Sequence, residues 1–142
     1  MTLGEKQRKF FYLFGKLIEW LYANGYEATF GEAYRSDEQA EINALGNFRR
    51  QELCAYLRAK NEFEQLAFCI GNNTGSGIRI TLHGRRLAVD INLFKDGVYL
   101  TDSASYAEAG AFWKTLDPSC CWGGDFPKPD AYHFSFTHEG IR

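Results

Sequence analysis

Three side chains in the second half of the sequence are of types that bind transition metals: His83, Asp90 and His133. A catalytic zinc ion typically takes three protein ligands and keeps its fourth position for water or substrate. Two neutral imidazoles and one carboxylate would leave the site a net positive charge, which polarises a carbonyl group and acidifies a bound water. These residue types therefore predict a hydrolytic zinc site, although a histidine at the end of a strand more commonly only makes hydrogen bonds.

The spacing of His83 and Asp90 constrains how the two side chains can meet. They are seven positions apart, and in one straight strand an odd spacing puts two side chains on opposite faces. The intervening Gly84-Arg85-Arg86 allows the chain to turn and bring both side chains to one side. Asp90 would then share a face with Asn92 and with Ala88, whose small side chain leaves space beside the metal. The alternate positions are apolar and are expected in the core: Leu87, Val89 and Ile91.

A second carboxylate, Asp130, lies three positions before His133. Pro127 and Pro129 hinder regular strand pairing here, so we expect Asp130 on a loop that can curl over the metal. There its carboxylate could take the proton of a bound water and pass it to a leaving amine. An ordinary turn residue is the structural alternative. His138 falls on the other strand face from His133 and is not expected to be a ligand.

Hydrophobic periodicity predicts the elements that carry these residues. Helices are predicted at residues 5–23, 36–45, 49–68 and 105–116. Strands are predicted at 26–34, 78–82, 87–92, 98–100 and 132–136, with loops at 71–77 and 122–130. Ser36 is the expected N-cap of the second helix, with Gln39 completing a capping box. Helices followed by adjacent strands are typical of an α+β domain with an antiparallel sheet and helices packed on it.

Bulk properties exclude several classes of protein. The 142 residues and a 45% hydrophobic content fit one domain spanning residues 1–142, expected to be a monomer. A net charge of -2 argues against nucleic acid as a partner, because phosphate binding needs a clustered basic face. Lys16 and Glu19 interrupt the first apolar segment, so we expect neither a secretory signal nor membrane insertion, and we expect synthesis in the cytoplasm.

The four cysteines contain no C-x-x-C pair, which disfavours a structural zinc knuckle. We expect free thiols at Cys54, Cys69, Cys120 and Cys121, as is usual in a reducing compartment. Cys54 and Cys69 lie among apolar helical residues and are expected in the core. The adjacent pair Cys120-Cys121 suggests no function.

Two segments, TLHGRRLAVDINLF (81–94) and WGGDFPKPDAYHF (122–134), resemble the zinc peptidases of the D-Ala-D-Ala carboxypeptidase and L-alanyl-D-glutamate endopeptidase family. That family includes VanY-type enzymes and phage endolysins. Its pattern is S-x-H-x-x-G-x-A-x-D followed by E-x-x-H or D-x-x-H, and the phage branch often carries W-G-G before the second element. The resemblance spans about residues 27–136 and implies a Hedgehog/DD-peptidase-like α+β fold.

The resemblance assigns roles to individual residues. It implies that His83, Asp90 and His133 bind one Zn2+ ion and that Asp130 is the catalytic acid/base. EAYRSDEQA (32–40) is similar to an earlier family element in which an arginine precedes a short helix. By this match Arg35 would steady the substrate carbonyl as negative charge develops.

Four further positions bear on the substrate. Thr81 stands where the family has serine and keeps the hydroxyl, so it is an expected substrate contact together with Arg35. Trp122 and Tyr132 flank the site and could pack on the substrate, with core or loop packing as the alternative. Arg86 replaces the family glycine, which we expect to alter the ligand loop or the substrate groove.

The implied activity is cleavage of a peptide bond in the stem peptide of bacterial peptidoglycan. W-G-G and D-x-x-H favour an L-alanyl-D-glutamate endopeptidase of the phage endolysin type, made in the host cytoplasm and released through a holin. A D,D-carboxypeptidase that trims D-Ala is the first alternative. A catalytically inactive metal-binding interaction domain of the same fold is the second.

Overall fold

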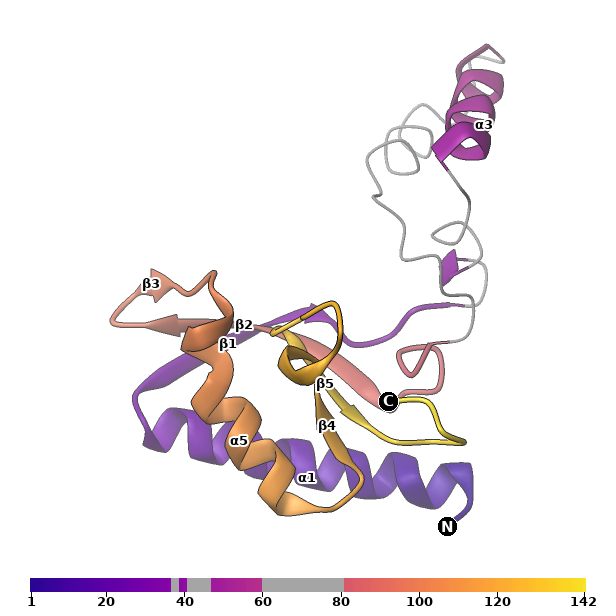
Figure 1. The fold of residues 1–142 in the computed structure, drawn as a ribbon. Coiled ribbons are helices and arrows are strands. Elements are labelled where there is room, and N and C mark those ends of the chain that lie inside the picture. Colours follow the sequence, from indigo (N-terminus) through magenta and orange to yellow (C-terminus); the bar gives the residue numbers. More distant parts are fainter. Residues whose placement is uncertain (37–38, 41–46, 60–80) are drawn as a thin grey trace. The chain divides into compact units, whose positions relative to one another are not determined.

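The computed structural model of this chain describes residues 1–36, 39–40, 47–59 and 81–142 (Figure 1). The chain divides into two compact units, Met1–Tyr34 with Leu82–Arg142 and Arg35–Thr81. The first unit holds the sheet and the proposed metal ligands. The expectation of one domain over residues 1–142 covers both units and stays a prediction.

The first unit begins with the long amphipathic helix α1, Leu3–Ala23. A capping box starts it: the Glu5 N–H donates to Thr2 Oγ1 at 3.3 Å, and the Thr2 N–H donates to Glu5 Oε2 at 2.6 Å. The helix ends at Asn24, and Gly25 takes the left-handed conformation with φ 76°. One stripe of the helix is buried: Phe10, Leu13, Leu17 and Leu21. The helix predicted at 5–23 is confirmed and begins two residues earlier.

Five strands of the described residues form one antiparallel sheet in the order β1-β2-β5-β4, with β3 paired to β2. Their bounds are Tyr26–Glu32 (β1), Ala88–Lys95 (β2), Val98–Tyr99 (β3), Cys120–Trp122 (β4) and His133–Phe136 (β5). A tight hairpin turn joins β2 to β3, with Asp96 and Gly97 both at positive φ. Strand β4 was not predicted as such, and the expected loop at 122–130 begins at its last residue.

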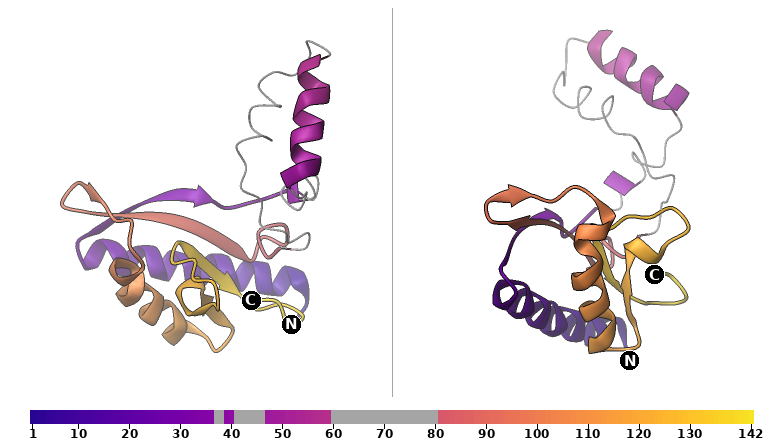
Figure 2. Two further views of the ribbon diagram at one scale, coloured as in Figure 1. Left: turned by 45° about the horizontal axis from the view of Figure 1, so that its top comes forward. Right: turned by 60° about the vertical axis from the view of Figure 1, so that its left-hand side comes forward.

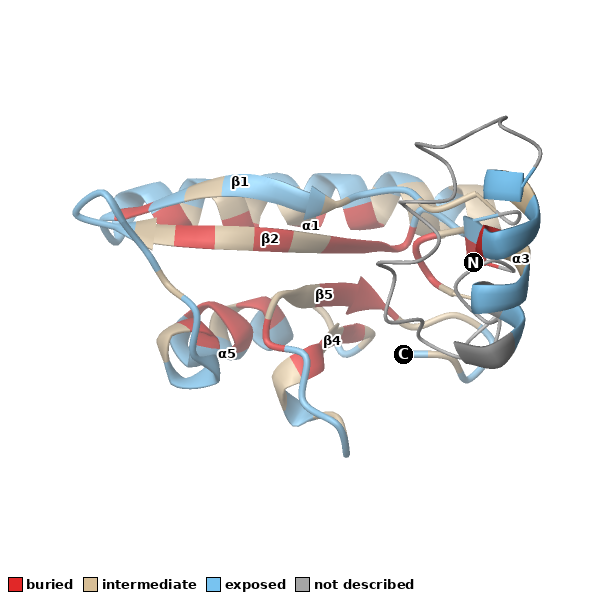
Figure 3. Cartoon of the chain, turned by 90° about the horizontal axis from the view of Figure 1, so that it is seen from above, coloured by how far each residue is buried: buried red, intermediate tan, exposed pale blue. Residues whose placement is uncertain are grey.

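The two faces of the sheet differ in character. Val89, Ile91 and Leu93 on β2 are buried. From Asp90 to the end of the strand, the side chains that alternate with them are half-buried or exposed (Figure 3). Helix α1 and helix α5, Ala107–Leu116, pack on the buried face, and the left view of Figure 2 shows both on one side of the sheet. A short 3-10 helix, η1 (Ser103–Tyr106), leads into α5. Polar side chains on the open face can therefore meet solvent or ligand.

The second unit is described in part. Its helix α3 runs from Asn47 to Ala59 and begins two residues before the helix predicted at 49–68. The Gln39 N–H donates to Ser36 Oγ at 3.1 Å, which confirms the predicted cap. The rest of the helix predicted at 36–45, residues 60–68, the loop at 71–77 and the strand positions 78–80 lie outside the described residues. Leu82 was expected to end that strand and instead lies in a turn.

No helix in the described ranges is both long and apolar enough to cross a membrane.

Candidate metal centre

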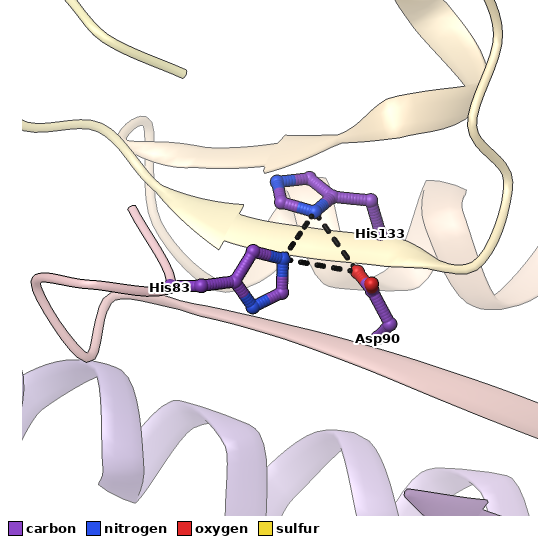
Figure 4. Close-up of side chains that lie close together, drawn as sticks. All are labelled: His83, Asp90 and His133. Carbon is purple, nitrogen blue, oxygen red and sulfur yellow. Dashed lines mark hydrogen bonds and ion pairs between the residues drawn. The ribbon is translucent and has the colours of Figure 1, made fainter. Parts of the chain in front are cut away.

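The three predicted ligands come together on the open face of the sheet (Figure 4). Asp90 on β2 and His133 on β5 are direct partners across the antiparallel pair, so their side chains start side by side. His83 arrives from the turn that precedes β2. The Leu87 N–H donates to the Leu82 carbonyl at 2.9 Å and closes this turn. Residues brought together from positions 83, 90 and 133 thus form one cluster, as the sequence predicted.

The turn before β2 depends on a residue in the left-handed region. Arg86 has φ 55°, and its N–H donates to the His83 carbonyl at 3.0 Å. A side chain with a Cβ is unfavourable in this conformation, whereas glycine adopts it freely. The glycine of the family pattern at this position therefore has a physical reason. Arg86 keeps the conformation and lays its guanidinium 5.2 Å from the centre of the Tyr34 ring.

The ligand atoms form a nearly equilateral triangle. His83 Nε2 lies 3.2 Å from His133 Nδ1, and Asp90 Oδ1 lies 3.0 Å from His133 Nδ1 and 3.3 Å from His83 Nε2. Zinc bonds of about 2.0–2.1 Å in a tetrahedron place ligand atoms about 3.3–3.4 Å apart. One triangular face of a zinc tetrahedron therefore fits these three atoms with shifts of a few tenths of an ångström, and the fourth corner is left for another ligand.

The electrostatics also suit a cation. Burial alone raises the pKa of the Asp90 carboxyl, but hydrogen bonds from His133 and His83 outweigh it and hold that pKa well below its usual range. Asp90 is therefore ionised at neutral pH, as a metal ligand must be. His83 is 4% exposed. Among the described residues no group hydrogen-bonds to its second nitrogen, Nδ1.

Asp130 lies next to this cluster, on the segment that leads into β5. Its N–H donates to the Gly123 carbonyl at 2.9 Å, and its own carbonyl accepts from the His133 N–H at 3.2 Å. Partial desolvation, and then the negative charge of Asp90, raises the pKa of the Asp130 carboxyl above its ordinary value. A raised pKa makes a carboxylate a better proton acceptor, which suits a group that takes a proton and then returns it.

The W-G-G segment has a packing role that the sequence did not reveal. A Cβ on Gly123 would lie 2.2 Å from the Asp130 carbonyl oxygen and 2.8 Å from His133 Cβ. A Cβ on Gly124 would lie 2.3 Å from the Trp122 ring. The Trp122 side chain is 9% exposed overall, and its indole N–H donates to the Ala131 carbonyl at 2.9 Å. The motif therefore fixes the backbone that carries Asp130 and His133.

The predicted substrate contacts have different surroundings. The burial of Trp122 agrees with the packing alternative, and its contact with substrate stays a prediction. Tyr132 is half-buried, and its hydroxyl donates to the Thr101 carbonyl at 3.1 Å. Arg35 and Thr81 belong to the second unit, so their roles also stay predictions.

The other histidine and the cysteines lie apart from the ligand set. His138 pairs with Ile141 in an isolated bridge, and its imidazole is not part of the metal-ligand group formed by the described residues. Cys54 is buried, as expected, and Cys120 and Cys121 are free thiols. Burial raises the pKa of Cys120 to about 12, so this thiol is unreactive. Cys69 lies outside the described residues.

Comparison with known proteins gives a fold but no sequence family. No protein-family model and no curated protein matches the sequence. A solved structure of the vancomycin-resistance D,D-pentapeptidase VanY, a mutant from a VanB-type cassette in complex with Zn(II), has a TM-score of 0.51 and 18% identity. The matched region covers 92% of this chain and 71% of the VanY chain. VanYB in complex with D-alanine-D-alanine has a TM-score of 0.48 and 18% identity over 92% and 70% of the two chains. The first likeness confirms the predicted α+β, D,D-peptidase-like fold.

Proposed function

We propose that this protein is a zinc peptidase that cleaves a peptide bond in the stem peptide of bacterial peptidoglycan. The observation that carries the proposal is the triangle of His83, Asp90 and His133, whose edges match a zinc tetrahedron. The D,D-peptidase-like fold supports it, because the VanY structure that shares this fold is described as a complex with Zn(II).

Each residue of the site has a proposed task. When bound, a zinc ion would act as a Lewis acid that polarises the substrate carbonyl and lowers the pKa of a water molecule. Asp90, ionised at neutral pH, and the two imidazoles of His83 and His133 would hold that ion. The Asp130 carboxylate accepts the proton of the attacking water and returns it to the leaving amine. Arg35 is proposed to stabilise the negative charge that develops on the carbonyl oxygen.

The proposed bond is the one between L-Ala and D-Glu, as in phage endolysins. W-G-G and D-x-x-H support this choice by resemblance. A monomer made in the host cytoplasm and released through a holin would fit such an enzyme. The likeness to a D,D-pentapeptidase favours the second candidate, a D,D-carboxypeptidase that removes D-Ala. Mass spectrometry of digested muropeptides separates the two, since a new N-terminal D-Glu indicates the endopeptidase and free D-Ala indicates the carboxypeptidase.

Metal analysis and two variants test the proposal together. We expect about one equivalent of zinc in the wild-type protein, retained by Asp130→Ala and lost by His133→Ala, with peptidoglycan clearing absent from both variants. Clearing that continues after chelation would rule out a zinc hydrolase. Zinc binding without any released product would instead support the inactive interaction domain. Normal turnover by Asp130→Ala would remove the proposed general base.

A further inference from the structure

The open face of the sheet continues beyond the ligands as a row of polar and aromatic side chains. Asn92 lies two residues after Asp90 on β2, so both side chains share this face. Thr29 on β1 is the direct partner of Asn92, and the Asn92 amide donates to Thr29 Oγ1 at 3.4 Å. Gly31 lies against Asp90 without a side chain, because a Cβ there would come within 3.2 Å of Asp90 Cβ. Gly31 therefore adds no side chain beside Asp90, and the neighbouring pair Asn92 and Thr29 is polar.

The β2–β3 hairpin adds aromatic rings to the same row. Tyr99 is the direct partner of Phe94, and their ring centroids are 5.2 Å apart. The Tyr99 hydroxyl donates to Asn92 Oδ1 at 3.3 Å. Tyr99 remains 44% exposed. Glu27, the partner of Phe94 on β1, puts a negative charge at the far end of the row.

We propose that this hairpin row, made of Thr29, Asn92, Phe94, Tyr99 and Glu27, binds the peptide substrate beside the scissile bond. The inference rests on the proposed function and extends it to the residues that hold the substrate. A peptide running from Asp90 to Phe94 follows four residues of strand, or about 13 Å, which matches about four residues of an extended peptide. A stem peptide is of this length.

The chemistry of the row fits a stem peptide. The Asn92 amide carries both donors and an acceptor, which suit the alternating carbonyl and N–H groups of a peptide backbone. Its present hydrogen bonds, at 3.4 and 3.3 Å, are long and therefore readily exchanged for substrate bonds. Phe94 and Tyr99 offer apolar surface to alanine methyl groups. Glu27 can pair with the free amino group of the diamino acid in the stem.

Neighbouring residues in β3 provide a matched pair of variants. Val98 and Tyr99 point to opposite faces, and both side chains are exposed, so neither substitution should affect folding. Binding of a lysine-containing stem pentapeptide to the metal-free protein is measured by calorimetry. We expect Tyr99→Ala to weaken binding about five- to tenfold and Val98→Ala to leave it unchanged. In the zinc-loaded protein Tyr99→Ala should raise KM with little change in kcat, because it removes binding common to ground and transition states.

Glu27 is tested with a modified ligand. Glu27→Gln should weaken binding of the pentapeptide with a free lysine amine and leave binding of the ε-acetylated pentapeptide unchanged. Equal binding and equal KM for wild type, Tyr99→Ala and Glu27→Gln would overturn the inference, even if the enzyme is active. Weakened binding in these variants, without cleavage by the zinc-loaded wild type, would uphold the row and reject the proposed activity. Failure of the wild-type protein to bind or cleave the peptide would overturn both.

Discussion

Gly123 should be one of the least replaceable residues of the first unit, although it does no chemistry. In Gly123→Ala the new Cβ would start 2.2 Å from the Asp130 carbonyl oxygen, and real Cβ atoms stay beyond 3.0 Å, so the two must separate by 0.8 Å (3.0 − 2.2). The contacted atom is backbone, tied to Gly123 by the hydrogen bond from the Asp130 N–H. Overpacking of this kind costs about 2–3 kcal/mol. For a chain of this length that lowers Tm by about 5–10 °C.

The same substitution should weaken zinc binding. The new Cβ would also lie 2.8 Å from His133 Cβ, and ligand geometry has to be held within about 0.5 Å. Thermal unfolding with chelator reports the packing cost, and competition with a zinc-responsive dye reports the affinity. Gly15→Ala is the matched control, because nothing lies within 4 Å of its Cβ and a mid-helix alanine should stabilise by about 0.5–1 kcal/mol. Wild-type Tm and zinc affinity in Gly123→Ala would refute this reasoning.

Three further predictions follow from single residues. In denaturant titrations, Arg86→Gly should have a free energy of unfolding equal to or above that of wild type, and Arg86→Ala should have one lower by about 1 kcal/mol. Both variants lose the contact with Tyr34, but only glycine relieves the positive φ. The ionised Asp90 should stabilise the metal-free protein above about pH 4, and this contribution should be lost as pH falls through its lowered folded pKa; urea titrations of Asp90→Asn should lack that slope. Trp113→Phe should cost about 2–3 kcal/mol by chemical denaturation, because its indole N–H serves two backbone carbonyls, at Cys121 and Ser135, each at 3.1 Å.

The meeting of His83, Asp90 and His133 could be predicted because their types suit zinc and their positions match the pattern that the sequence resembles. The three ligands are the types that zinc prefers, and the odd spacing of His83 and Asp90 required a turn that Gly84-Arg85-Arg86 could supply. The left-handed residue of that turn is Arg86 rather than Gly84. Conformational preference alone would predict the left-handed conformation at Gly84. Which residue adopts it depends on how the chain enters β2.

The strand β4 and the role of Gly123 could not be predicted in the same way. A strand of three residues, Cys120–Trp122, is too short to show alternation, and the glycines and prolines that follow it indicate a loop. Gly123 is needed because of contacts with Asp130 and His133, which lie seven and ten positions further along the chain. Such contacts arise from tertiary packing, and no local pattern signals them.

The fold itself prepares the metal centre. Asp90 and His133 face one another because of the β2–β5 register, and a slip of one residue would turn either side chain to the buried face. That register is held by packing far from the ligands, since Val89 and Phe134 are also direct partners and both are buried in the core. Packing on the apolar face of the sheet therefore determines how the three ligand side chains are placed. A metal entering it has little conformational entropy left to overcome, because the chain has already ordered the ligands through its core.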